Sequence, residues 1–239
     1  MTWLWRIFFS GLWLARVWCA DVSGTVTLTG SDDPAVRRHK DYSGVVVWLD
    51  LPGGADNVTR GNTSRARMAQ KNKHFLPHVL AIPAGASVEF PNFDPIFHNA
   101  FSNYSGQLFD VGLYPPGSSR TVAFKRPGIV RVFCNIHPAM SAIIAVLDTP
   151  WFAVSSASGD YRIHDVPAGN YQLRVFHERA TEETLAALAR RVGVPNGAAL
   201  ALPAISISET GFIPAPHKNK YGKDYPPAID DSPAYPARP

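Results

Sequence analysis

The sequence predicts an all-β fold, built as a Greek-key β-sandwich with a smaller accessory β-sandwich and one short helix. Valine, isoleucine and phenylalanine recur in short runs, which is typical of strands. Turns rich in proline and glycine separate several of these runs within residues 75–147. A chain of 239 residues also holds enough apolar side chains for one large domain or two small ones.

The larger sandwich is expected in the central part of the chain, residues 74–149. Its strands are predicted at residues 75–82, 86–90, 119–125, 129–134 and 142–147. Turn signals such as Pro83-Ala84-Gly85 and Pro127-Gly128 lie between them. This close spacing predicts the Greek-key arrangement.

The accessory sandwich is expected from residues 21–52 and 150–210. Its strands are predicted at residues 22–29, 45–49, 161–163, 171–176 and 205–208. The first of them alternates apolar and polar side chains, as a half-buried strand does.

One helix is expected at residues 181–192. Thr181 can cap its start, and Gly193 follows its end. Leu185, Leu188 and Val192 form a single apolar stripe, so we expect this helix to pack on the sandwich.

The N-terminus has the pattern of a signal peptide at residues 1–20. Arg6 precedes an apolar run at residues 7–15, and cleavage is expected after Cys19 or Ala20. A retained anchor helix is the alternative, although the run is short for a bilayer. We therefore expect a periplasmic or secreted protein with no membrane span after cleavage.

The charge distribution argues against nucleic acid as a partner. The formal net charge is +4, and removal of Arg6 and Arg16 with the leader leaves +2. Residues 53–73 are expected to be a basic, solvated loop, with a docking rim for an acidic partner as the alternative.

Residues 211–239 form a proline-rich tail that cannot build a core, so it is extended, wrapped over the surface or disordered.

A cluster of metal-binding residue types closes one predicted strand. Cys134, His137 and Met140 follow one another at three-residue spacing, and Cys134 is the only cysteine left once the leader is removed. A lone thiol excludes a disulfide framework. One thiolate, imidazole nitrogens and a weak thioether are a ligand set that suits copper in both of its oxidation states.

A second imidazole must come from another part of the chain. His98 is the natural source, because it lies in the loop after the predicted strand at residues 86–90. A lone histidine is more often a surface or hydrogen-bonded residue, and a lone cysteine a small buried apolar one. Neither interpretation explains the two motifs together.

Residues 75–147 resemble the plastocyanin and amicyanin branch of the cupredoxins. In that family a His-Asn pair follows a Gly-x-x-Val-x-Phe strand, which here is residues 85–90, and a Pro-Gly turn leads into the cysteine-bearing strand, here Pro127-Gly128. The whole pattern is also similar to bacterial cupredoxin-like proteins labelled as methylamine-utilisation proteins.

The resemblance implies one type 1 (blue) copper ion held by His98, Cys134, His137 and Met140. It implies that Asn99 supports the site from outside the ligand set, by joining the two ligand loops. The loop from Cys134 to Met140 is short, as in amicyanin.

Two departures from the family stand beside the cysteine. Asn135-Ile136 replaces a small hydroxyl residue and proline, and Phe133 replaces a tyrosine of plastocyanin-like members. The first removes no ligand, and the second puts an electron route through that phenol in doubt.

Residues 158–173 resemble the closing hairpin of carboxypeptidase-regulatory-like and transthyretin-like sandwiches. The opening strands of such a module are present only before the copper-binding part, at residues 23–26 and 45–49. The hypothesis is that the cupredoxin is inserted into the accessory sandwich, so that residues 21–52 pair with residues 151–177.

The function expected from these residues is one-electron transfer. Copper would exchange electrons with redox proteins, such as a periplasmic haem protein or a dehydrogenase, through the edge of His137. Pro138, Ala139, Ile96 and Phe97 are expected to form an apolar docking face around it. The alternative is a copper-trafficking or surface binding module of the same fold.

The sequence is not expected to encode an enzyme. A copper oxidase or nitrite reductase needs a second copper site with an open position, and no His-x-His pair is present. His74 and His78 lie close together, but no third ligand accompanies them.

Overall fold

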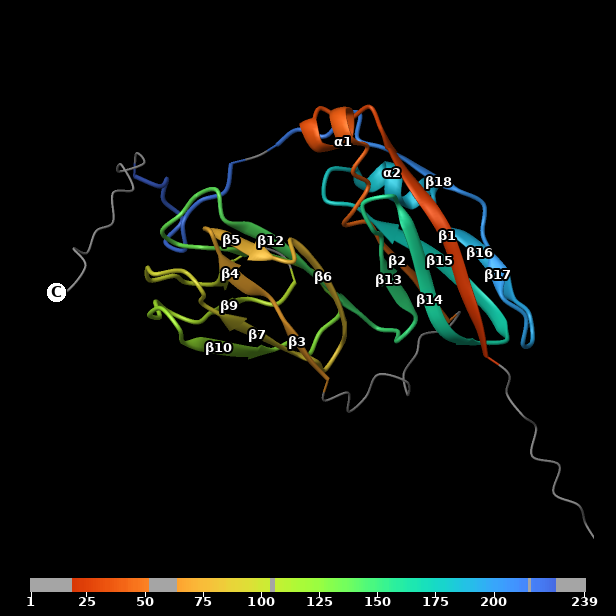
Figure 1. Ribbon diagram of the computed structural model, residues 1–239, viewed down its shortest axis with the longest axis horizontal. Coiled ribbons are helices and arrows are strands. Elements are labelled where there is room, and N and C mark those ends of the chain that lie inside the picture. The colour runs from red at the N-terminus through yellow and green to blue at the C-terminus, as the bar shows by residue number, and fades with distance from the viewer. Residues whose placement is uncertain (1–18, 52–63, 104–105, 215, 227–239) are drawn as a thin grey trace, which may run out of the picture.

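The computed structural model describes residues 19–51, 64–103, 106–214 and 216–226, and it confirms the all-β fold. Two groups of sheets lie side by side (Figure 1). We call residues 64–149 the central sandwich, and residues 19–51 with 150–209 the accessory sandwich. No helix in the described ranges is long and apolar enough to cross a membrane.

The accessory sandwich is built from both sides of the central segment. One of its sheets has the order β14-β1-β17, with β18 also paired to β1, and the other has the order β13-β2-β15-β16. The strands of the first sheet are β1 (Cys19–Thr29), β14 (Asp160–Pro167), β17 (Leu200–Ala201) and β18 (Ile205–Ser208). Those of the second are β2 (Val46–Asp50), β13 (Phe152–Val154), β15 (Gly169–Phe176) and β16 (Arg190–Val194).

The predicted pairing across the central segment is confirmed. β1 runs antiparallel to β14, and β2 runs antiparallel to both β13 and β15. The inward side chains of these strands share one apolar core, in which Val22, Val26, Leu49 and Leu173 are completely buried. Alternation along β1 therefore places its apolar face where the sequence predicts it.

The central sandwich encloses a second apolar core. One sheet has the order β6-β12-β11-β8-β9, another has the order β10-β7-β3, and β4 and β5 form a separate hairpin. The first sheet consists of β6 (Val79–Pro83), β12 (Ser141–Leu147), β11 (Gly128–Phe133), β8 (Phe101–Ser102) and β9 (Phe109–Asp110). The others are β10 (Ser119–Ala123), β7 (Ser87–Pro91), β3 (Arg65–Arg67), β4 (Ala69–Lys71) and β5 (His74–Leu76).

Strand β12 is buried on both of its faces. Ile144 and Val146 point into the central core, whereas Ile143 and Leu147 belong to a third cluster that includes Val46 of the accessory sandwich. Successive side chains of a strand alternate between its two faces. The run of apolar residues in β12 therefore packs the two sandwiches together.

The helical part of the prediction needs correction. The helix expected at residues 181–192 ends early, as α2 (Glu182–Ala187), although Thr181 does cap it. Val192 and Val194 instead alternate inward along β16, which pairs with β15. A second short helix that the sequence analysis missed, α1 (Pro34–His39), is capped by the Asp33 side chain.

Other expectations are changed or lie outside the described residues. Residues 64–73, the described end of the expected basic loop, contain the strands β3 and β4. β3 pairs in parallel with β7, and β4 pairs with β5. Of the expected leader, only Cys19 and Ala20 are described, and both belong to β1. Within the described part of the proline-rich tail, residues 211–214 and 216–226 contain neither helix nor strand.

Candidate metal centre

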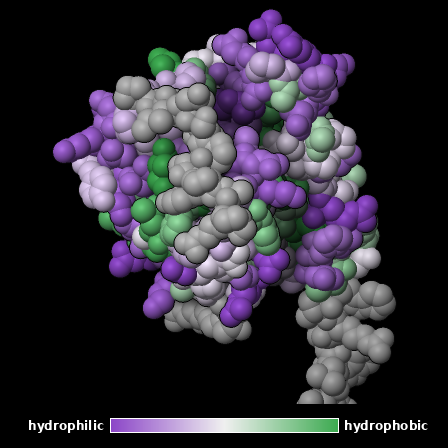
Figure 2. All heavy atoms as spheres, turned by 60° about the vertical axis from the view of Figure 1, so that its left-hand side comes forward, coloured by the Kyte–Doolittle hydropathy of each residue, from purple (hydrophilic) through white to green (hydrophobic). Residues whose placement is uncertain are grey.

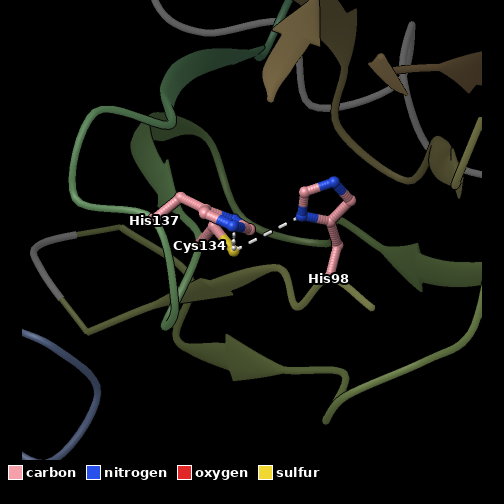
Figure 3. A group of neighbouring side chains, drawn as sticks. All are labelled: His98, Cys134 and His137. Atoms are coloured by element: carbon pink, nitrogen blue, oxygen red, sulfur yellow. Dashed lines mark hydrogen bonds between the residues drawn. The ribbon is translucent and has the colours of Figure 1, made fainter. Parts of the chain in front are cut away.

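Three of the four residues predicted to bind metal lie together at one end of the central sandwich. Cys134 follows the last residue of β11, His137 lies in the loop before β12, and His98 lies in the loop between β7 and β8. The Sγ atom of Cys134 is 3.8 Å from Nδ1 of His98 and 3.7 Å from Nδ1 of His137 (Figure 3). All three ligand atoms lie within 4.8 Å of one another.

The distances between these atoms suit a single metal ion. Metal–sulfur and metal–nitrogen bonds of about 2.3 and 2.0 Å, the values for zinc, allow such ligand atoms to lie up to about 4.3 Å apart. Both sulfur–nitrogen distances are shorter than that limit. The rings of His98 and His137 are inclined at 66°, with centroids 5.0 Å apart, so their nitrogens approach the sulfur from different directions.

Met140 closes the ligand loop and is buried beside the cysteine. Its backbone N–H donates to the His137 carbonyl at 3.0 Å, and the Cys134 N–H donates to the Met140 carbonyl at 3.2 Å. The side chains of Met140 and Cys134 are both completely buried in the same apolar cluster. The three-residue spacing predicted from sequence thus produces a tight loop.

Asp94 orients His98, and the sequence analysis missed it. Its Oδ2 accepts a hydrogen bond of 2.8 Å from Nε2 of His98. A carboxylate can only accept, so Nε2 carries the proton and Nδ1 turns its lone pair toward Cys134. The signal in the sequence, an acid four residues before the histidine, is too common to identify such a pair by itself.

Asp94 is held in turn by the backbone of a neighbouring turn. The N–H groups of Asn72 and Lys73 donate to its two oxygens at 2.5 and 2.8 Å. Burial opposes the charged carboxylate, but these donors and His98 hold the pKa of Asp94 below its usual value. Burial lowers the pKa of His98, which outweighs the opposite effect of Asp94. The lower pKa favours the neutral imidazole of His98, which is the form that binds metal.

The His98 loop has a second buried support that the sequence did not reveal. The Gln70 amide donates to the Asn99 carbonyl at 3.0 Å and accepts the Tyr114 hydroxyl at 2.6 Å. Burial, with a smaller contribution from nearby Cys134, raises the pKa of the Tyr114 phenol. The phenol therefore stays neutral and remains a donor.

Asn99 does not join the two ligand loops directly, contrary to the prediction. It is completely buried, and its Nδ2 donates to Oδ1 of Asp110 at 2.7 Å. Asp110 lies at the end of β9 and belongs to neither ligand loop. The connection from Asn99 to the Cys134 loop is indirect, and it passes through residues of the tail.

His74 and His78, which lie close together in the sequence, have partners of their own. Nδ1 of His74 lies 2.6 Å from the Asn72 carbonyl, and Nε2 of His78 lies 2.9 Å from the Glu178 carboxylate. Within the described ranges, His98, Cys134 and His137 form the one group of three such ligands.

Apolar side chains are exposed close to the ligand loops in the sequence. Phe93, Phe97 and Ile136 are between 41% and 57% exposed, and Pro138 and Ala139 are exposed as well. Figure 2 turns the metal-binding end toward the viewer and shows apolar patches among hydrophilic ones. The docking face predicted around His137 therefore has accessible apolar residues.

Comparison with known proteins gives matches among solved structures only. No protein-family model and no curated protein matches the sequence. A purple cupredoxin from Nitrosopumilus maritimus is 23% identical over 35% of this chain and 99% of its own, with a TM-score of 0.32. An oxidized variant of amicyanin is 15% identical over 42% of this chain and 98% of its own, with a TM-score of 0.33.

A third match bears on the prediction that the chain is not an enzyme. The copper-containing nitrite reductase from Thermus scotoductus is 23% identical over 52% of this chain and 28% of its own, with a TM-score of 0.35. Since this similar structure is an enzyme by name, the prediction of a non-enzyme is wrong as an exclusion.

Proposed function

We propose that this chain binds one copper ion in a type 1 site and passes single electrons between redox proteins. The observation that carries the proposal is the buried cluster in which both Nδ1 atoms, from His98 and His137, face the Sγ of Cys134. These ligand atoms come from loops 36 residues apart in the sequence. A thiol is a weak hydrogen-bonding group, so hydrogen bonding alone gives little reason for two imidazole nitrogens to face a buried one.

Copper suits this donor set better than zinc does. Structural zinc sites use four strong nitrogen or thiolate ligands, whereas the fourth group expected here is the weak thioether of Met140. A bound copper ion would supply the one-electron chemistry, because thiolate and thioether favour its reduced form while imidazole suits both forms.

The side chains of this protein would hold the site in one arrangement. Asp94 fixes the ring of His98, and the backbone hydrogen bonds between Cys134, His137 and Met140 fix the loop. Burial of Cys134 excludes water from the sulfur. Such support from outside the ligand set limits the rearrangement that a change of charge would otherwise cause.

His137 gives the buried site a route to the surface. It is half-buried, and the exposed residues Ile136 and Pro138 flank it. An apolar surface of this kind suits the small, transient interfaces of electron-transfer partners. The proposal includes export to the periplasm or beyond, with a haem protein or a dehydrogenase as the partner.

The test is the visible spectrum of the full chain after addition of Cu(II). We expect an intense visible absorption band, which a copper–thiolate bond in a blue-copper site gives. Cys134→Ser should abolish it, and Cys19→Ser is the matched control because Cys19 is the other free cysteine of the described chain. A wild-type protein that binds Cu(II) with no band, or a band that survives Cys134→Ser, would overturn the proposal.

A further inference from the structure

The C-terminal residues 216–226 lie across the loop that carries Cys134 and His137, and we call them the strap. In Figure 1 this part of the chain, drawn in blue, leaves the accessory sandwich and reaches the far end of the central one. It contains no helix or strand, so its placement comes from side-chain and backbone contacts with the metal-binding end.

Three hydrogen bonds join the strap to the ligand loop. The Tyr225 hydroxyl donates to the carbonyl of Cys134 at 2.8 Å, and Nε2 of His217 donates to the carbonyl of Pro138 at 2.8 Å. The backbone N–H of Lys220 donates to Oδ1 of Asn135 at 3.0 Å. The strap thus contacts the ligand loop at three residues.

Aromatic rings add a fourth contact. The ring of His217 stacks on Phe133, with centroids 3.9 Å apart and planes inclined at 27°. Tyr225 meets the edge of the same imidazole, at a centroid distance of 5.2 Å. Phe133 is the residue before Cys134, so the strap packs against the start of the ligand loop, next to the cysteine.

The strap is also linked to the other ligand loop through Asp110. Nζ of Lys220 lies 2.8 Å from Oδ2 of Asp110, whose Oδ1 accepts from Asn99, next to His98. Burial raises the pKa of Asp110, but the bonds from Lys220, Gly112 and Asn99 together hold it below its usual value. Lys220 therefore faces an ionised carboxylate, and it connects the two loops that Asn99 alone does not connect.

We infer that the strap is part of the metal centre, and that Tyr225 and His217 are positioning residues that hold the ligand loop closed over Cys134. The Tyr225 and His217 bonds satisfy loop carbonyls that would otherwise turn to water. Limiting the access of water to the site affects the reduction potential of a metal held there. The effect on potential rests on the proposed function, whereas the closure of the loop does not.

The first test needs no metal. In a Cys19→Ser background, Cys134 is the only thiol, and its alkylation by iodoacetamide reports how often the loop opens. A chain that ends at Gly211 should react at least about tenfold faster, because three hydrogen bonds to the loop are lost. Tyr225→Phe should raise the rate about fivefold, since it removes one hydroxyl and keeps the ring.

Tyr221→Phe is the matched control. Tyr221 lies on the same strap but is 70% exposed, so its loss of a hydroxyl should leave the rate unchanged. The retained far-UV circular dichroism of the shortened chain separates loop opening from unfolding. Equal alkylation rates in the wild type, the shortened chain and Tyr225→Phe would overturn the inference.

The second test uses the copper-loaded protein. Tyr225→Phe should lower the reduction potential, because greater access of water favours the more highly charged oxidised site. Tyr221→Phe should not change it. An absorption band that forms normally, with the potential and the alkylation rate unchanged in Tyr225→Phe, would refute the role of the strap and leave the proposed function intact. If the wild type gives no band with Cu(II) but Tyr225→Phe is alkylated faster, the proposed function is refuted and the closure of the loop by the strap is supported.

Discussion

The hydrogen bond from His98 to Asp94 predicts a large effect for one conservative substitution, Asp94→Asn. Asp94 is 6% exposed and accepts from three groups: the ring of His98 and the backbone N–H groups of Asn72 and Lys73. An asparagine has one acceptor oxygen in place of two, so its amide N–H₂ must face at least one of these donors.

The size of the effect follows from the bonds that are lost. A hydrogen bond to a charged group contributes about 1.5–3 kcal/mol, so Asp94→Asn should lower the free energy of unfolding of the metal-free protein by about 2 kcal/mol. It should also weaken copper binding roughly 10- to 100-fold, as expected when the partner of a ligating histidine is removed. Since 1.4 kcal/mol is a factor of ten, the two effects have similar magnitudes.

Urea denaturation of the metal-free protein and a competitive copper titration against a chelator measure the two quantities. Asp32→Asn is the control, because Asp32 is exposed and lies in the accessory sandwich. If Asp94→Asn binds copper within twofold of the wild type and unfolds at the same urea concentration, Asp94 does not orient His98 in the way its geometry indicates.

Three further predictions concern stability outside the ligand set. Glu178, by its hydrogen bond, raises the pKa of His78, so the stabilisation is present below about pH 6.5 and is lost as pH rises through the higher folded value. His78→Gln should therefore cost about 0.5 kcal/mol at pH 6 and nothing at pH 9, by urea denaturation; a cost that grows with pH would contradict this. Glu209→Gln should cost about 3 kcal/mol in the same assay, because the Glu209 carboxylate is 3% exposed and is paired with both His177 and Arg179. An unchanged midpoint of urea denaturation would contradict this. Leu173→Ala should cost about 3 kcal/mol in thermal unfolding without moving the copper absorption band, and a moved band would show that the accessory core shapes the site.

The sequence predicted the candidate ligand group because its signal is local. Cys134, His137 and Met140 lie within one short loop, and His98 follows a strand whose pattern is easy to read. The supports of the site were not predictable in this way. Tyr225 meets the Cys134 carbonyl across 91 residues, and neither residue carries a local pattern that names the other.

The accessory sandwich shows the same division between local and distant information. Alternating apolar residues identified β1, a continuous apolar run identified β2, and the resemblance of residues 158–173 to a closing hairpin suggested their pairing. The helix was drawn too long because Leu185 and Leu188 continue into Val192 at helical spacing. In the structure Val192 belongs to β16, which pairs with β15. Such tertiary pairing overrides a weak helical pattern.

The double burial of β12 has a consequence for how this chain tolerates being divided. Ile143, Ala145 and Leu147 are at most 5% exposed, and the apolar cluster to which they belong includes Val46, Trp48 and Phe152 of the accessory sandwich. A polypeptide limited to residues 64–149 would expose these apolar side chains to water. We expect it to self-associate or to adhere to other apolar surfaces, because the accessory sandwich would no longer cover this face.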